Sequence, residues 1–264
     1  MINFQKIANA LAAHPDIWLA RAQILPAATA AQIQRAEEQL GAPLHPEIKA
    51  FYEYHNGVAI QWMYKKSDRF QARKYDVDTS ELPFWMDLFG GDFLPFDGKI
   101  IINPIGEVFV RSYDEIEEYS DFSPEIAYRE YIEMPDLPVA GAYTFGERQF
   151  TSQEAFHQQL RLFDFSSLDD GTLMLFEPQK SDPDILYTED HWQNFEPKLT
   201  LSLSKYLHHI AYNFGWLGWS GYQGLRRGYF KGAAPAPSHF DVETRLAELI
   251  ENNKFYGDLR AHKK

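Results

Sequence analysis

The sequence predicts an α+β protein in which a mostly antiparallel sheet is packed by N-terminal and C-terminal helices. Helix start and stop signals gather in the first sixty residues and again near the end, while strand-like apolar runs bounded by turn residues fill much of the middle. Such an order of elements is typical of an α+β layout. We expect a single domain over residues 1–264, because no linker divides the chain.

The first sixty residues read as helices, and the clearest one carries signals at both ends. Thr29 and Gln32 form a capping box at its start. The apolar residues that then recur at helical spacing are Ile33, Ala36 and Leu40. Gly41 is expected to end the helix in the left-handed conformation, and Pro43 prevents the helix from continuing.

A second helix is expected to begin at Pro46, with Glu47 complementing the positive end of the helix dipole. Asn56 and Gly57 both tolerate positive φ, so we expect this helix to end there. The residues that would share one side of it are Ile48, Phe51, Tyr52 and His55. His55 would then lie near the negative end of the dipole, which favours a structural role for it over a catalytic one.

The middle of the chain alternates strand and helix patterns. Residues 93–110 combine strand-like runs with turn signals at Asp97-Gly98 and Asn103-Pro104, which predicts antiparallel hairpins. Three short helices are expected to start at Ser112, Ser123 and Thr151.

The C-terminal part contains further strands and two helices. Residues 160–165, 172–176 and 184–187 predict strands of one antiparallel sheet. Residues 203–214 predict an amphipathic helix, and a last helix is expected from about Asp241 to Asn252. The apolar stripe of the amphipathic helix would consist of Leu203, Leu207, Ile210 and Phe214.

Composition limits the classes of function. A formal net charge of −13, from 38 acidic against 25 basic residues, disfavours nucleic-acid binding and favours a basic protein partner, although moderate acidity also serves solubility. The absence of cysteine excludes disulfides and cysteine nucleophiles and fits a reducing compartment. The chain shows neither a signal-peptide pattern nor an apolar run of about 18 residues, so we expect a cytoplasmic protein that does not associate with membranes.

Catalytic and metal-binding motifs are incomplete. Ser202 and Lys205 match an S-x-x-K pattern, but the companion elements are missing and a serine at a helix start is the simpler interpretation. The nine histidines never take H-E-x-x-H spacing. The adjacent His208 and His209 would point about 100° apart on a helix, so they would not share a metal ion without distortion. We therefore expect no catalytic residue, no metal site and no cofactor.

An acidic segment is the first candidate for a binding surface. Residues 114–136 hold nine acidic residues against one base, Arg129. Two aromatic rings within this segment are flanked by polar residues and could anchor a contact with another protein. The proposed contact residues are Glu117, Glu118, Tyr119, Asp121 and Phe122. A solvated helical face remains the alternative interpretation of the same residues.

A glycine- and tryptophan-rich segment is the second candidate. The glycines at strict three-residue spacing are Gly215, Gly218, Gly221 and Gly224. A phosphate-binding loop is one interpretation, but no phosphate-loop fingerprint matches and large aromatic residues fill the gaps. We favour an irregular loop that packs Trp216, Trp219 and Tyr222 either against the core or into a partner.

The run I-x-x-A-E-x-x-L-G-x-x-L-x-P-E-x-K-x-F-Y-x-x-x-N-G at residues 33–57 resembles the N-terminal signature of the SUKH superfamily, which contains the fungal Smi/Knr cell-wall-synthesis regulators. The residues of this signature that would fix the fold are Gly41, Pro46, Asn56 and Gly57. His45 separates Leu44 from Pro46, where the family often has Leu-Pro.

The resemblance covers two parts of the chain. Residues 27–62 and 160–212 would form a SUKH-like core, separated by a long helical and hairpin insertion at about 65–159 and followed by a C-terminal extension at 215–264. Neither the insertion nor the extension has a counterpart in a compact family member.

The resemblance also implies a function. Bacterial SUKH proteins are largely immunity proteins of polymorphic toxin systems, which bind and block a cognate toxin and are not enzymes. The expectation is therefore a protein that neutralises a toxin with a basic surface by direct contact. A non-enzymatic regulatory module, similar to the fungal relatives, is the first alternative. An enzyme that acts on carbohydrate or nucleotide through scattered acids and the tryptophan-rich loop is the second.

Overall fold

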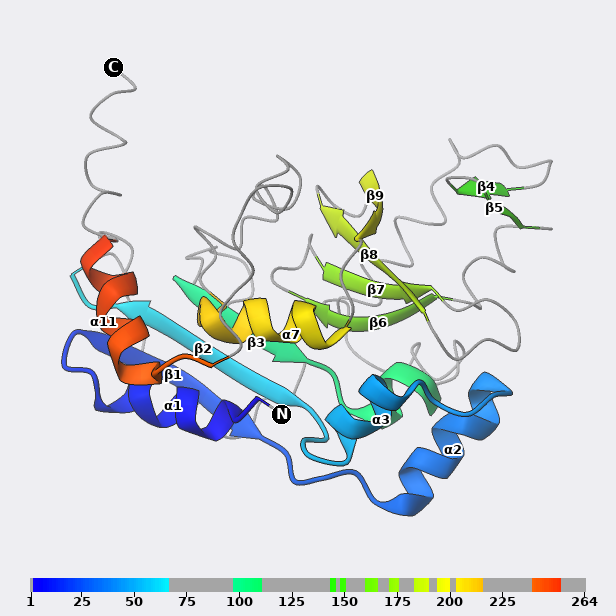
Figure 1. Ribbon diagram of the computed structural model, residues 1–264, viewed down its shortest axis with the longest axis horizontal. Coiled ribbons are helices and arrows are strands. Elements are labelled where there is room, and N and C mark those ends of the chain that lie inside the picture. Colours follow the sequence, from blue (N-terminus) through cyan, green and yellow to red (C-terminus); the bar gives the residue numbers. More distant parts are fainter. Residues whose placement is uncertain are drawn as a thin grey trace.

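A seven-stranded antiparallel sheet runs through the part of the chain that the computed structural model describes (Figure 1). The described residues are 2–66, 97–110, 143–145, 148–150, 160–165, 171–175, 183–189, 194–199, 203–215 and 239–252. In spatial order the strands are β1 (Ile17–Ile24), β2 (Val58–Tyr64), β3 (Gly98–Ile102), β6 (Leu160–Phe165), β7 (Gly171–Leu175), β8 (Asp184–Glu189) and β9 (Asn194–Leu199). A separate two-stranded sheet contains β4 (Tyr143–Phe145) and β5 (Arg148–Phe150).

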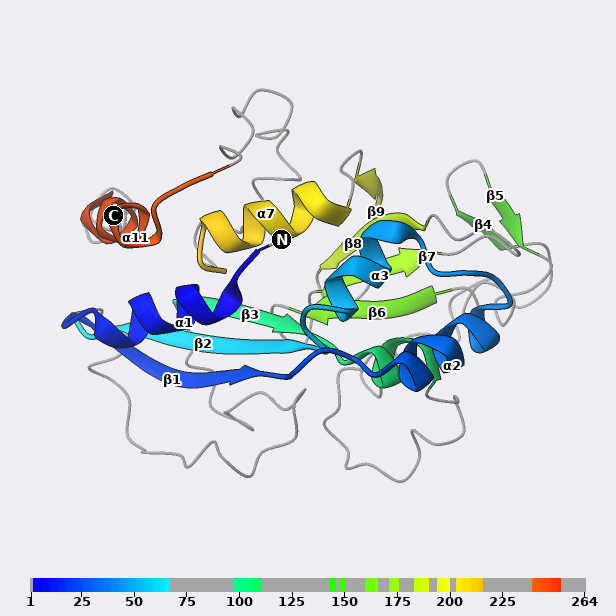
Figure 2. The ribbon, with the colours of Figure 1, turned by 60° about the horizontal axis from the view of Figure 1, so that its bottom comes forward.

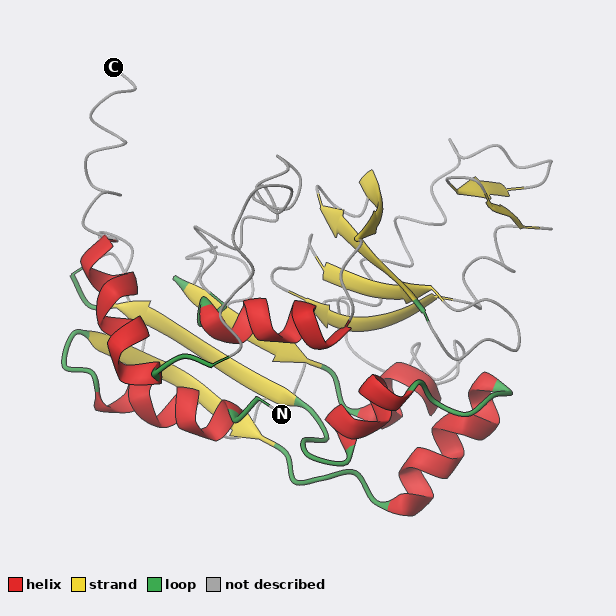
Figure 3. Ribbon diagram, in the orientation of Figure 1, coloured by secondary structure: helices red, strands yellow, loops and turns green. Residues whose placement is uncertain are grey.

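The described part of the chain also contains five α-helices. They are α1 (Phe4–Ala13), α2 (Ala30–Leu40), α3 (Pro46–Tyr52), α7 (Leu203–Tyr212) and α11 (Val242–Asn252), together with a π-helical turn η1 (Gly106–Val110). Figure 2 shows α1, α7 and α11 on the same side of β1, β2 and β3. Helices α1 and α11 contact each other although they come from opposite ends of the sequence. The α+β class predicted from the sequence is therefore confirmed (Figure 3).

The capping signals predicted around α2 are present. The Thr29 side chain accepts a hydrogen bond from the Gln32 amide, and the Gln32 side chain accepts one from the Thr29 amide, which completes the capping box. Gly41 ends the helix with a φ of 69°, the left-handed conformation that glycine adopts without strain. Ile33 and Ala36 are buried, so the predicted apolar spacing faces the core.

Helix α3 begins at Pro46 as predicted, but it ends at Tyr52 and does not extend to the Asn56-Gly57 pair. In a longer helix the Tyr52 carbonyl would pair with the Asn56 amide. Instead, the Tyr52 carbonyl accepts from the Ala28 amide at 2.8 Å, and the Asn56 amide donates to the Pro26 carbonyl at 3.0 Å. Gly57 takes a φ of 116°, whereas Asn56 does not adopt a positive φ. Tertiary hydrogen bonds therefore decide where the helix stops.

Strand β1 occupies a stretch where helices were expected, so that expectation was wrong. Its backbone pairs with β2, and the register shifts between Leu19 and Arg21. The irregularity interrupts the alternation of buried and exposed residues that would mark a strand in the sequence. The pairing partner is also distant along the chain, so local patterns did not indicate it.

The prediction of a hairpin at Asn103-Pro104 is also wrong. After β3, Gly106–Val110 forms a helical turn and not a second strand. The amides of Glu107 and Val108 both donate to the Pro104 carbonyl, at 2.9 and 3.1 Å, which closes the turn. A short apolar run of this kind fits a buried strand and a buried helical turn equally well, and periodicity alone does not separate them.

The C-terminal predictions fare better. Strands β6, β7 and β8 and helices α7 and α11 appear where the sequence placed them, whereas β9 was not predicted. Phe214 lies beyond the end of α7, with a φ of 56°, although it was expected on the helical stripe. The three helix starts expected at Ser112, Ser123 and Thr151 lie outside the described residues.

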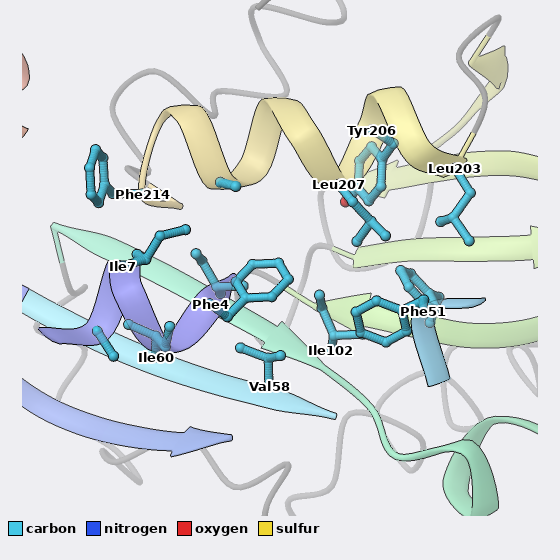
Figure 4. Close-up of a cluster of buried hydrophobic side chains, with 14 of the residues drawn as sticks. Phe4, Ile7, Phe51, Val58, Ile60, Ile102, Leu203, Tyr206, Leu207 and Phe214 are labelled. Atoms are coloured by element: carbon cyan, nitrogen blue, oxygen red, sulfur yellow. The ribbon is translucent and has the colours of Figure 1, made fainter. Parts of the chain in front are cut away.

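A cluster of buried apolar side chains lies between the helices and the sheet (Figure 4). It joins α1, α3, β2, β3 and α7, and side chains of α11 also belong to it. Members labelled in the figure are Phe4, Ile7, Phe51, Val58, Ile60, Ile102, Leu203, Tyr206, Leu207 and Phe214. Burying each large apolar side chain contributes about 1.5–3 kcal/mol, so this cluster is the main source of stability in the described part.

The two halves of the sheet meet at β3 and β6. Ile102 pairs with Asp164 there, and the Asn103 amide donates to the Phe163 carbonyl at 2.9 Å. Tyr206 of α7 donates its hydroxyl proton to the buried carboxylate of Asp164, with the two oxygens 2.5 Å apart. Helix α7 therefore holds the junction between residues that are far apart in the sequence.

Candidate partner-binding site

The partner-contact residues predicted from the sequence lie outside the described residues. They are Glu117, Glu118, Tyr119, Asp121, Phe122, Trp216 and Trp219. The structure does define the point from which the glycine- and tryptophan-rich segment departs, because the chain is described up to Gly215. That point is fixed to the sheet by several contacts.

The turn after α7 is tied to β2 and β3 through its backbone. The indole Nε1 of Trp62 donates to the Phe214 carbonyl at 2.8 Å. The Lys99 amide donates to the Gly215 carbonyl at 2.7 Å, and the Gly215 amide donates to the Ile210 carbonyl in the last part of α7 at 3.0 Å. Phe214 and Gly215 both adopt positive φ, at 56° and 61°. These hydrogen bonds fix the residue that directly precedes Trp216.

Two glycines allow this close approach. A Cβ atom at Gly98 would lie 2.1 Å from Nε1 of Trp62, and one at Gly215 would lie 2.1 Å from the Lys99 carbonyl oxygen. Gly215 also needs its positive φ, which other residues adopt with strain. Gly215 was noted in the sequence for its three-residue spacing, but the structural reason for a glycine at this position is the contact with β3.

The signature residues form part of the scaffold. The Asn56 side chain accepts from the Ile105 amide at 2.9 Å, and the Gly57 carbonyl accepts from the Leu25 amide at 3.1 Å. The buried hydroxyl of Tyr52 donates to the Asn103 carbonyl at 3.0 Å. Asn56 and Gly57 therefore connect three segments, while Gly41 ends α2 and Pro46 starts α3.

His55 is buried with a relative exposure of 7% and lies among aromatic rings. Its ring centroid lies 5.7 Å from that of Phe4, 6.5 Å from that of Phe51 and 4.4 Å from that of Tyr54. Burial lowers the pKa of His55, and a hydrogen bond with the backbone of Ile2 opposes this effect. The position is that of a scaffold residue, packed between α1 and the end of α3.

A buried tyrosine lies close to the Asp164 carboxylate. Burial, and then the negative charge of Asp164, raises the pKa of Tyr52 well above its ordinary value. Lys205, from the S-x-x-K pattern, is exposed on α7, and Ser202 lies outside the described residues. Within the described ranges, no group of three histidine or acidic side chains is arranged to hold a metal ion.

Sequence reasoning missed a row of buried polar residues across three strands. Arg21 on β1 pairs with Gln61 on β2, which in turn pairs with Lys99 on β3. All three are buried, with relative exposures of 3%, 0% and 5%. Lys99 directly precedes an apolar run, and no local signal in the sequence indicated that its side chain would be buried.

Comparison with known families identifies the scaffold. A family model described as the SMI1 / KNR4 family (SUKH-1) matches residues 27–215. The chain belongs to the SMI1 / KNR4 family (SUKH-1). A search of curated proteins found no match. The SUKH match begins before α2 and ends at the Gly215 anchor, so α1, β1 and α11 lie outside it.

In this SUKH chain the elements outside the match pack together. Strand β1 extends the sheet by pairing with β2, α1 contacts β1, and α11 contacts α1. Arg245 of α11 lies over the ring of Tyr212 in α7, with its Cζ atom 4.1 Å from the ring centroid. Among the described helices, none combines the length and the apolar character that crossing a bilayer requires.

Proposed function

We propose that this SUKH protein is an immunity protein that neutralises a cognate toxin by direct protein–protein contact in the cytoplasm. The observation that carries the proposal is the family match over residues 27–215, because the SUKH family is known for immunity proteins. The formal net charge of −13 supports a partner with a basic surface, since opposite charge speeds association and selects among partners.

The proposed contacts are the acidic segment and the tryptophans that follow the Gly215 anchor. In our proposal Glu117, Glu118 and Asp121 meet basic residues that the toxin uses for its own substrate. Aromatic side chains contribute most of the binding energy in many interfaces, so Tyr119, Phe122, Trp216 and Trp219 are the proposed anchors. Fixing the segment at Gly215 would lower the entropy lost when Trp216 binds.

We further propose that the protein either occludes the toxin's active site or locks its fold, and that it does not act by catalysis. The motifs that suggested catalysis are incomplete in the sequence. Where the structure describes titratable groups, His55 and Asp164 are buried among scaffold residues, and Asp164 accepts a hydrogen bond from Tyr206. These placements support a binding protein.

The test is survival on co-expression with the neighbouring gene. The adjoining upstream open reading frame would be placed under tight control and induced with this protein, with a stop-codon version of it, and with the variant E117K/E118K/D121K. We expect colonies with the intact protein and death with the stop-codon control. Pull-down of the pair from rescued cells then distinguishes direct binding from an indirect effect.

A harmless neighbour, or one that kills regardless, would count against the immunity proposal. The regulatory module, which the fungal members of the superfamily suggest, would then become the leading hypothesis. Its partner would be a cellular enzyme encoded elsewhere, and pull-down with the tagged protein would be the next experiment.

A further inference from the structure

His55 connects the N-terminal helix to the end of α3. Its imidazole makes T-shaped contacts with Phe4 of α1 and Phe51 of α3, and it forms a hydrogen bond with the Ile2 backbone just before α1. Helix α1 lies outside the SUKH match, whereas His55 lies within it. The imidazole therefore bridges the family core and the added helix.

The surroundings of this imidazole suit the neutral form only. Its Nε2 atom is buried, and no atom in the described part of the chain forms a hydrogen bond with it. The charged residues of α1, α3 and the residue after α3 are Lys6, Glu47, Lys49 and Glu53. The Glu47 carboxylate accepts from the Ser204 amide, and Lys49 forms an ion pair with Glu37. Within the described part of the chain, no charge on these residues opposes the desolvation of His55.

Protonation would place a charge and an unpaired N–H among three aromatic rings. Burying such a group without a partner is strongly unfavourable, so the proton can be accommodated only if water reaches the ring. The simplest route is movement of α1, which covers the ring through Phe4. Helix α1 would then separate from the end of α3.

We propose that His55 is a pH-sensitive latch whose protonation frees helix α1 from the SUKH core under mildly acidic conditions. The proposal does not rest on the immunity function. An opened α1 would expose the apolar side that carries Phe4, Ile7 and Leu11, all of which are buried in the closed form. Acid conditions would thus uncover a surface that is hidden at neutral pH.

The size of the effect follows from proton linkage. An imidazole that titrates at its ordinary pKa of about 6.5 when open, and stays neutral when closed, increases the opening equilibrium constant by up to about tenfold between pH 7.5 and 5.5. Burial lowers the pKa of His55 in the closed form, so opening takes up protons and is favoured as the pH falls.

Hydrogen exchange of the α1 amides tests the latch. Protection factors, corrected for the intrinsic exchange rate at each pH, would be measured by mass spectrometry on the full-length chain at pH 7.5 and 5.5. For the wild type we expect α1 protection to fall several-fold, with about tenfold as the limit. In H55F, which keeps an aromatic ring but does not titrate, we expect the pH dependence to disappear. H239N, at an exposed histidine, is the matched control and should behave as wild type.

Two results would overturn the latch: α1 protection that is independent of pH in the wild type, or an equal fall in H55F. If H55F does not fold, NMR titration of the His55 imidazole in the wild type decides the matter. A His55 titration midpoint that coincides with the loss of α1 protection supports the latch. A His55 titration that leaves α1 protection unchanged refutes it.

Discussion

The carboxylate of Glu47 in α3 accepts a hydrogen bond from the backbone amide of Ser204 in the first turn of α7, with the two atoms 2.9 Å apart. The residues are 157 positions apart in the sequence. Glu47 also lies in the first turn of its own helix, where a negative charge is favourable. One side chain therefore complements the positive ends of two helices.

Replacing Glu47 should lower the stability of the protein. We expect E47A to lower the free energy of unfolding by about 1 kcal/mol, the usual cost of losing a side-chain cap and its charge at a helix N-terminus. E47Q keeps an acceptor and should lose less. Urea denaturation measures both, and E53Q, at an exposed glutamate after α3, is the control. Equal stability of E47A and E53Q would contradict the capping role.

Gly98 provides a steric test of the anchor, and Gly106 is its control. G98A places a methyl group 2.1 Å from the indole nitrogen, so we expect a loss of about 3 kcal/mol or failure to fold. G106A has no atom within 4 Å of the new methyl group and should be neutral or slightly stabilising. Thermal unfolding of the two variants should separate them clearly, and similar melting temperatures would show that the Trp62 contact is not tight.

The buried pair of Tyr206 and Asp164 should contribute to the junction of the sheet. Y206F removes the hydroxyl donor and leaves the buried carboxylate with one hydrogen bond fewer, so we expect a loss of about 1.5–3 kcal/mol. Y212F is the control, because Tyr212 lies on the same helix and its hydroxyl forms no hydrogen bond within the described ranges. A change below about 0.5 kcal/mol for Y206F in chemical denaturation would argue against this role.

Stability should fall as the pH drops below about 6.5, the ordinary pKa of histidine. Burial lowers the pKa of His55 in the folded state, and burial followed by the positive charge of His208 lowers that of His209. The unfolded chain then binds protons that the folded chain excludes, so the stabilisation is complete above the unfolded pKa and is lost below it. Each of these two histidines lowers the free energy of unfolding by at most about 1.4 kcal/mol per pH unit.

Urea denaturation midpoints measured between pH 7.5 and 5.5 give the slope of stability against pH. H209F should flatten it in part, whereas H239N should leave it unchanged. A slope in H209F as steep as that of the wild type would exclude His209 as a contributor.

Reversing the acidic segment should slow toxin binding. We expect E117K/E118K/D121K to reduce the association rate by at least tenfold at low salt, with a smaller effect at high salt, because charge acts mainly on diffusional encounter. E38K/E53K/E251K changes the net charge by the same amount at exposed positions elsewhere and serves as the control. Stopped-flow mixing with the purified partner measures both rates. Equal slowing in both variants would show that overall charge, and not this segment, attracts the toxin.

Local signals in the sequence were sufficient for several elements. The Thr29 capping box, the Gly41 cap and the Pro46 start each depend on contacts within a few residues, so they hold wherever the helix packs. The SUKH resemblance rested on the same local pattern, and the family match over residues 27–215 confirmed it. The predicted partner-contact residues stay predictions, because they lie outside the described residues.

The sequence by itself determined the family, the fold class, the helix caps and the apolar strands of the C-terminal half. Only the tertiary structure decided where α3 ends, that residues 17–24 form a strand, and that Glu47 caps a second helix. It also decided why Gly98 and Gly215 are glycines. The physical reason is distance along the chain: these features depend on hydrogen bonds and close contacts between segments that only folding brings together, and a local pattern carries no record of them.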